Sequence, residues 1–159
     1  MFKIPRKYIP KSLRTRDLQK QTRNIQQTRK LYKKKKYLDR PKLKSFQSKP
    51  SPHVVNAKKM YNVSRVVPSK ELSRASKCSM RGLRQITKKG RGAYYSSGSR
   101  PNQTAQSWAR ARLGSALTGA NASTVDYHIL EKECKSGSKA LTLAKKAMKN
   151  KTRKKLNKI

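Results

Sequence analysis

An excess of positive charge sets the first limit on the structure of this chain. The sequence has 43 Lys or Arg residues against 6 Asp or Glu, a formal net charge of +37 over 159 residues. Leu, Ile, Val and Phe supply only 27 of those residues, below the roughly 20% under which a highly charged chain is expected to be disordered by itself. The composition therefore excludes an ordinary self-sufficient globular enzyme. It predicts a polyanion or a surrounding assembly as partner.

Membrane-spanning and exported classes are not expected. No stretch approaches the roughly 18 consecutive apolar residues of a transmembrane helix, and the first residues lack the apolar run of a secretory signal. Pro5 and Pro10 would break the early helix of a mitochondrial targeting peptide. We expect a soluble or peripheral protein.

The chemistry-bearing side chains are few and scattered. A zinc site would have to recruit Cys78, Cys134, His53 and His128 from four separate places, whereas structural zinc sites show local ligand pairs. A disulfide and two inert thiols remain as alternatives for the cysteines. We expect no metal and no cofactor.

A catalytic site is not expected either. Asp126 and His128 are two residues apart, so on a helix they point to different sides and cannot act as an orienting group and its base. No Gly-x-Ser-x-Gly elbow, P-loop or dinucleotide fingerprint is present. The sequence thus predicts a protein that is not an enzyme and has no small-molecule substrate.

Residues 1–60 are predicted to form a basic arm. Five prolines punctuate this segment and leave room for one helix, from Ser12 to about Tyr32. Its apolar positions are too widely spaced for a packed stripe, so we expect the helix to lie on a partner rather than in a core of its own. The remainder of the arm is predicted to be extended.

Residues 61–103 are predicted to be irregular apart from one short helix capped by Ser69. The two β-branched runs between His53 and Val67 are too brief to distinguish strand from loop. The segment 81–101 is rich in Gly, Ser and Arg, which indicates a structured loop or a peptide-like binding element.

The best helical signals lie in the last third of the chain. Residues 104–134 are predicted to form a hairpin of two antiparallel helices, the first capped by Thr104 and the second starting with a weak capping box of Ser123 and Asp126. Residues 135–159 predict a basic amphipathic helix, suited equally to a partner groove, an anionic membrane or nucleic acid. The expected fold class is mainly α: a small helical module with a long, extended, irregular N-terminal arm and little or no β-structure.

Two groups of side chains leave alternatives open. Tyr94, Tyr95, Arg91 and Arg100 would hold phosphates and stack bases in a Gly-rich loop. In the favoured alternative, the tyrosines fold back onto the helix that carries Trp108 and the arginines are merely solvated.

Arg112 would form a cation–π contact with Trp108 or an ion pair with Asp126, or would reach to solvent. The lysine run at 33–36 is solvated or faces phosphates. The candidate interaction residues are therefore Lys33, Lys34, Lys35, Lys36, Arg91, Tyr94, Tyr95, Arg100, Trp108 and Arg112.

About a quarter of the chain resembles a known viral module. The matching strings are KGRGAYYSSGSRPNQT at 89–104, SWARARL at 107–113, SALTG at 115–119 and VDYHIL at 125–130. They resemble a short module in basic, minor-capsid-type virion proteins of large icosahedral double-stranded DNA viruses, especially those of algae. The resemblance implies a virion protein but carries no reaction mechanism.

Two functions are compatible with this resemblance. Symmetric contacts in a capsid would hold a basic arm in place, whereas sequence-independent wrapping of DNA would not. We therefore expect a minor capsid protein on the inner side of the shell, tying the major capsid protein and other minor capsid proteins together, with internal membrane head groups as a further contact. The alternative is a nucleic-acid-binding protein, either a virion DNA condenser or a ribosomal protein whose arms thread RNA.

Overall fold

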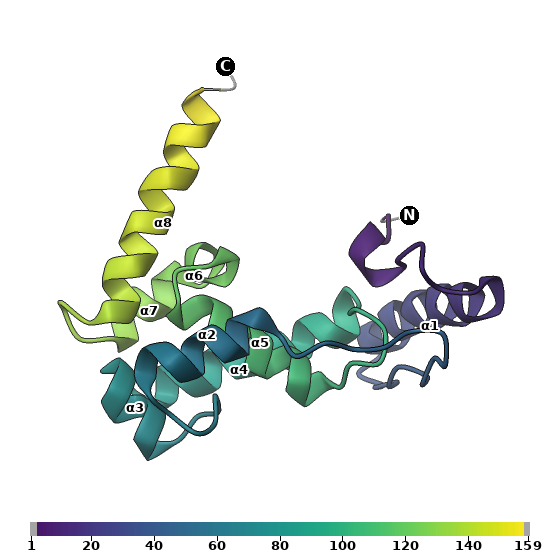
Figure 1. Cartoon of the computed structure of the whole chain (residues 1–159), viewed down its shortest axis with the longest axis horizontal. Helices are drawn as coiled ribbons and strands as arrows, with labels where there is room; N and C mark the ends of the chain where they lie inside the picture. The colour runs from purple at the N-terminus through teal and green to yellow at the C-terminus, as the bar shows by residue number, and fades with distance from the viewer. Residues whose placement is uncertain (1–2, 158–159) are drawn as a thin grey trace. The chain divides into compact units, whose positions relative to one another are not determined.

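The chain is mainly helical, which confirms the expected fold class. The computed structural model describes residues 3–157, and this range contains no β-strand (Figure 1). The helices in chain order are η1 (Arg6–Tyr8), α1 (Thr15–Lys33), α2 (Pro52–Tyr61), α3 (Lys70–Ser76), α4 (Met80–Ser96), α5 (Ala105–Leu117), α6 (Asn121–Val125), α7 (Tyr127–Glu133) and α8 (Lys139–Leu156).

The described residues divide between two compact units. Unit 1 is drawn from Met1–Lys49 and Gly90–Trp108, and unit 2 from Pro50–Lys89 and Ala109–Ile159. Helices α4 and α5 each contribute residues to both units.

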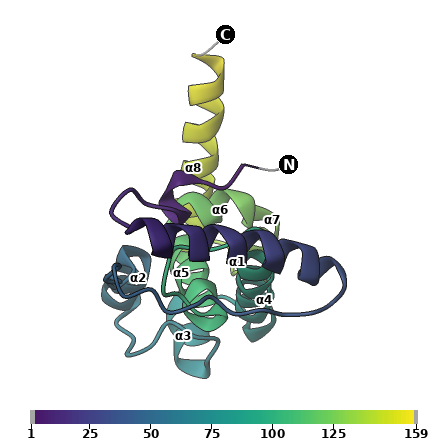
Figure 2. The ribbon, with the colours of Figure 1, turned by 90° about the vertical axis from the view of Figure 1, so that its right-hand side faces the viewer.

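Unit 1 is built around α1, so the long, extended N-terminal arm that the sequence predicts is not confirmed. The predicted helix is present as Thr15–Lys33, but its Ile25 is completely buried. The space beside Ile25 is so tight that a Cβ on Gly98 would lie 3.1 Å from its Cγ2 atom. Figure 2 shows α1 with η1 folded back beside it. The N-terminal segment therefore has a core of its own.

Polar contacts attach the rest of the segment to unit 1. The Gln21 side-chain amide is buried and donates to the carbonyls of Tyr8 and Ser99, at 3.2 and 3.1 Å. Residues 34–49 contain no helix, as expected, but Leu43 is buried and exchanges two hydrogen bonds with the Asn102 side chain, at 2.7 and 3.0 Å. The spacing of apolar residues did not predict this packing, because many of the side chains buried in unit 1 are polar.

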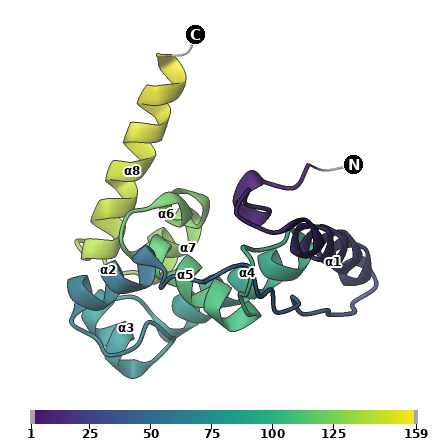
Figure 3. The same cartoon turned by 45° about the vertical axis from the view of Figure 1, so that its right-hand side comes forward.

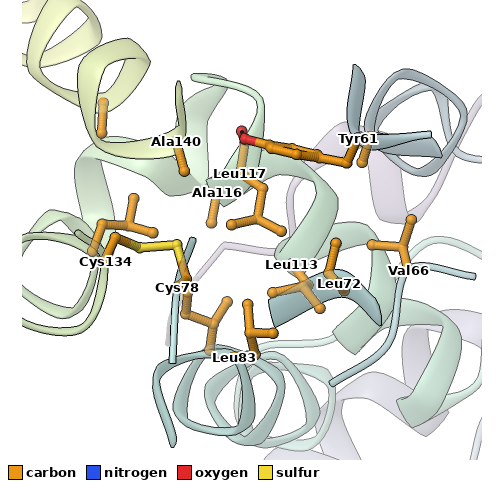
Figure 4. Close-up of a cluster of buried hydrophobic side chains, with 14 of the residues drawn as sticks. Tyr61, Val66, Leu72, Cys78, Leu83, Leu113, Ala116, Leu117, Cys134 and Ala140 are labelled. Atoms are coloured by element: carbon orange, nitrogen blue, oxygen red, sulfur yellow. Dashed lines mark hydrogen bonds between the residues drawn. A yellow bond between two sulfur atoms is a disulfide. The ribbon is translucent and has the colours of Figure 1, made fainter. Parts of the chain in front are cut away.

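Unit 2 contains the larger hydrophobic core. Figure 4 shows Leu72, Leu83 and Leu113 facing one another in this cluster. Cys78 and Cys134 form a disulfide with an S–S distance of 2.02 Å, which resolves the alternative left open for the cysteines. Backbone hydrogen bonds flank the bridge, from Ser79 to Glu133 and from Lys135 to Lys77.

The Gly-rich segment that was expected to be a loop is largely helical, as α4. A buried face runs along this helix through Leu83, Ile86, Gly90 and Tyr94. Gly82 allows α4 to lie close to α7, since a Cβ at this position would be 2.5 Å from Cβ of Glu133. Glycine normally disfavours a helix interior, but here the tertiary contacts outweigh that local preference.

The second helix of the predicted hairpin is divided into α6 and α7. The break falls at Asp126 (φ −100°, ψ 18°), whose side chain is fully buried. The predicted capping box is wrong, because the Ser123 hydroxyl donates to the Ala120 carbonyl at 2.6 Å and the Asp126 carboxylate binds two cations instead. Both short helices pack against α8.

Other helix ends agree with the sequence. Ser69, Thr104 and Ser138 each accept a backbone N–H in the first turn of the helix that follows, as expected for N-caps. The region at 53–67 does not agree: strand and loop were the expected alternatives, but residues 52–61 form the helix α2, which begins at Pro52, a residue suited to a first helical turn. Helix α8 starts in the core of unit 2, and its C-terminal half extends beyond α6 and α7 (Figure 3).

Candidate functional site

The cationic side chains cover the surface and are barely neutralised. Of the 42 Lys and Arg residues that the structure describes, 39 are exposed; the exceptions are Arg29, Arg40 and Arg112. Six carboxylates cannot balance 43 cations, and one of the six, Asp126, is shared by two of them. The chain therefore presents a surplus of positive charge to any partner.

Arg112 forms the predicted ion pair with Asp126. Its Nε and Nη2 atoms donate to the two carboxylate oxygens, each at 2.8 Å, and Lys89 approaches Oδ1 at 2.9 Å. Burial alone would raise the pKa of Asp126, but hydrogen bonds from Arg112 and Lys89 outweigh it and hold that pKa below its ordinary value. Trp108 instead contacts Tyr8, with ring centroids 5.7 Å apart. Arg112 is thus a structural residue.

Tyr94 is also structural. It is fully buried, and its hydroxyl accepts the Arg40 backbone N–H at 2.9 Å and donates to the Gln103 carbonyl at 3.1 Å. The Arg40 guanidinium lies 4.4 Å from the ring centroid and donates to the Tyr94 carbonyl. Burial, the largest effect, raises the pKa of Tyr94. No base can stack on a ring enclosed in this way.

In the favoured alternative the tyrosines fold back onto the helix that carries Trp108. Tyr94 is buried as that alternative requires, but its hydroxyl bonds to Arg40 and Gln103, which lie outside that helix. Arg91 and Arg100 are exposed, Arg91 on a helix and Arg100 in the turn that follows it. Because most of the segment is helical, the predicted Gly-rich anion-binding loop is absent from it.

Sequence reasoning missed a cluster of three aromatic side chains in unit 1. We define the tyrosine cluster as Tyr32, Tyr37 and Tyr95. The ring centroid of Tyr37 lies 5.0 Å from that of Tyr95 and 6.1 Å from that of Tyr32, both in edge contacts. Tyr37 is 66% exposed. The signal that could have found it is the placement of tyrosines on both sides of the lysine run, in LYKKKKY.

The lysine run joins the first two members of this cluster. We define the lysine turn as Lys33–Lys36, all of whose side chains are exposed. The Lys35 N–H donates to the Tyr32 carbonyl and the Lys36 N–H to the Leu31 carbonyl, at 2.9 and 3.0 Å, and Lys35 has a φ of 57°. These bonds form a Schellman motif that ends α1. The turn carries Tyr37 back beside the last turn of α1.

A second cationic feature is the outer half of α8. The helix carries eight Lys or Arg residues and no Asp or Glu, and every described residue from Lys149 onward is exposed. Its apolar residues in this half are Met148 and Leu156, too few for a buried stripe.

Among residues 3–157, no group of three or more His, Cys, Asp or Glu side chains could hold a metal ion. No helix in the same range is long and apolar enough to cross a membrane.

These features define a class: a small, disulfide-bonded, all-helical protein with a strongly cationic surface. Within that class, the chain belongs to a family of unknown function, DUF5824, whose model matches residues 5–129. The match includes the N-terminal segment and ends inside α7, so α8 lies outside it. No curated protein and no solved structure matches the chain.

Proposed function

We propose that this chain is a structural virion protein of the minor capsid type. The observation that carries the proposal is the cationic surface: 39 of 42 described Lys and Arg residues are exposed, and the chain has only six acids to neutralise them. A partner with fixed negative charge can supply the missing counterions. The resemblance of residues 89–130 to basic virion proteins favours a viral shell as the place where that partner is found.

The proposed mode of attachment differs from a long arm. Residues 3–49 are folded into unit 1, so contacts to the major capsid protein and other minor capsid proteins would come from the surfaces of compact units. Exposed ion pairs are individually weak, about 0–1 kcal/mol each. Many of them acting together would give firm attachment that added salt weakens.

A nucleic-acid-binding role is the second candidate, and α8 favours it. A helix with eight cations and no acid, exposed along its outer half, suits a phosphate backbone better than it suits an apolar groove. An anionic membrane inside the shell would attract the same helix. Both partners remain alternatives to an acidic capsomer surface.

The test is to strip purified particles of DNA with nuclease and of lipid with detergent, and then to ask where this protein remains. A minor capsid protein stays with DNA-free, lipid-free shells at low salt and is released as the salt concentration rises. Complete loss with the genome, from shells that stay intact, would contradict the proposal and leave nucleic acid as the partner. Localisation in a map of the intact particle provides the independent check.

A further inference from the structure

We propose that the tyrosine cluster and the lysine turn form a binding surface for single-stranded nucleic acid. This inference goes beyond the capsid role, because it assigns a partner to a surface of unit 1 that shell attachment does not require. It rests on the exposed ring of Tyr37 and on the cations fixed beside it. Unpaired bases and their phosphates are the chemistry that matches both groups.

The Tyr37 side chain stays largely exposed even though two other aromatic rings contact it. Its ring contacts Tyr32 and Tyr95, yet 66% of the residue remains exposed to solvent. The two contacts restrict the ring's orientation, so little conformational entropy remains to be lost when a flat ligand stacks on it. An aromatic ring that is held in place and uncovered is the arrangement that proteins use to stack unpaired bases.

The ring's support extends into the core of unit 1. Tyr95 contacts the buried Tyr94 ring at 4.9 Å, and the Tyr32 hydroxyl lies against α4 at Gly92, where an added Cβ would be 3.3 Å from it. Tyr37 therefore rests on side chains that are themselves anchored. A ring in a mobile loop would have no such support.

The lysine turn supplies the phosphate-binding groups. Four consecutive ammonium groups precede Tyr37, and the two closing hydrogen bonds of the Schellman motif fix the backbone that carries them. The negative end of the α1 dipole accounts for lysines in the last helical turn, but not for the exposed aromatic ring that follows them. Cations and a stacking surface together are required for binding a single strand.

The charge in this region favours an anion over an acidic or apolar peptide site. Asp39 is the single acid between Leu18 and Lys70, and its carboxylate accepts the Tyr95 hydroxyl at 3.2 Å. A duplex satisfies the lysines but keeps its base faces stacked inside the helix. An acidic protein surface offers charge without flat rings to stack. A single strand therefore matches both the tyrosine cluster, through its bases, and the lysine turn, through its phosphates.

The direct test measures binding of a fluorescein-labelled 20-nucleotide dT strand, and of a 20-base-pair duplex, to the full chain by anisotropy across a salt series. Tyr37→Ala should weaken binding to the dT strand about 5- to 100-fold, the loss expected for one stacked base. Its salt dependence should stay unchanged, because no charge is removed. Tyr37→Phe keeps the ring face and should bind like the unmodified protein.

A matched pair of charge variants separates this surface from general electrostatics. Changing Lys33, Lys34, Lys35 and Lys36 together to Gln should weaken dT binding and flatten its salt dependence. The control changes Lys58, Lys59, Lys70 and Lys77 of unit 2 to Gln, which removes the same charge from exposed positions outside both the lysine turn and α8. The control should have the smaller effect on the dT strand.

Three outcomes would overturn the inference. These are unchanged dT binding by Tyr37→Ala, equal losses in the two lysine variants, and tighter binding to the duplex than to the single strand at equal salt. Circular dichroism of Tyr37→Ala provides the folding control, and its helical signal should be unchanged because the side chain is exposed. None of these outcomes depends on whether the protein remains with viral shells, so this inference and the capsid proposal can fail separately.

Discussion

At Asp126, a buried carboxylate holds together segments that are distant in the sequence. Arg112 comes from α5 and Lys89 from α4, and both bind the acid at the break between α6 and α7. Asp126 is one of only six acids in the chain, and it lies where the backbone departs from helical geometry between α6 and α7. Losing this carboxylate would leave a partly buried guanidinium without its counterion, which is costly.

The first prediction concerns the pH dependence of stability. The pKa of Asp126 is lower in the folded protein than its ordinary value of 3.8. Between these two pKa values the unfolded chain binds more protons, so stability rises with pH in that window. The contribution should be complete above about pH 5 and be lost as pH falls through the folded pKa. Urea unfolding between pH 2.5 and 7 measures it.

Substitution of the acid tests the same ion pairs at neutral pH. Asp126→Asn should lower the free energy of unfolding at pH 7 by about 2–4 kcal/mol and flatten its decline in acid. Glu131→Gln, at an exposed position of the same α7 region, is the control and should change stability little. Equal effects of the two substitutions would rule out a special role for Asp126.

A second residue-scale prediction rests on Gly114. A Cβ at this position would lie 2.6 Å from the carbonyl oxygen of His53, a backbone atom that cannot easily move aside. Gly114→Ala should therefore lower the thermal midpoint, with a cost of about 1–3 kcal/mol. Gly92→Ala is the matched control in another helix, because its Cβ would meet only the end of the Tyr32 side chain. That variant should keep or raise the midpoint, since alanine favours a helix.

Among the elements, α1 ends in an unusual way. The C′ position of its Schellman motif is usually glycine, because that residue has a positive φ. Here Lys35 occupies it, with a φ of 57°. The chain thus keeps a charged side chain at a position where glycine would be less strained, as it also does at Lys77 after α3.

This arrangement predicts a gain in stability from a small substitution. Lys35→Gly should raise the free energy of unfolding of unit 1 by about 0.5–1 kcal/mol, because glycine adopts positive φ without a steric cost. Lys34→Gly removes the same charge at a φ of −95°, where glycine has no such advantage. A thermal melt of both variants checks the difference. Equal shifts of the thermal midpoint in Lys35→Gly and Lys34→Gly would show that the lost charge, and not the backbone geometry, determines the change in stability.

The helices also show which parts of the fold could be predicted from the sequence and which could not. The helices at 15–33 and 139–156 and the N-caps Ser69 and Thr104 follow from local patterns, and all were predicted. Helix α4 was missed because its glycines act through tertiary contacts, such as the close approach of Gly82 to Glu133. The ion pair at Asp126 was among the alternatives, whereas the tyrosine cluster was not. Its members come together because the lysine turn brings Tyr37 back to Tyr32 and because α4 places Tyr95 beside Tyr37, and hydrophobic periodicity predicts neither contact.

At the scale of the whole molecule, the disulfide closes a long loop. Cys78 and Cys134 are 56 residues apart in sequence and join the start of α4 to the end of α7. Such a link lowers the conformational entropy of the unfolded chain more than a short loop does. It stabilises a unit whose surface carries strong charge repulsion.

The bridge should therefore carry a large share of the stability of unit 2. Changing both Cys78 and Cys134 to Ser should cost about 4 kcal/mol, from the loop-closure entropy of roughly 57 residues. Urea unfolding with and without dithiothreitol measures the effect. Reductant should destabilise the unmodified chain to a similar degree and leave the double variant unchanged. Insensitivity of the unmodified chain to reductant would contradict this account.

The division of unit 1 between two stretches of sequence has a consequence for synthesis. Residues 3–49 pack against a later stretch of unit 1 that includes Tyr94 and Asn102, and this stretch is made only after some 40 residues of unit 2. At about 5–20 residues per second, the N-terminal segment waits several seconds on the ribosome. During that interval this basic segment lacks the contacts that bury Ile25, so the nascent chain should depend on a holding chaperone until its first helix has a core to join.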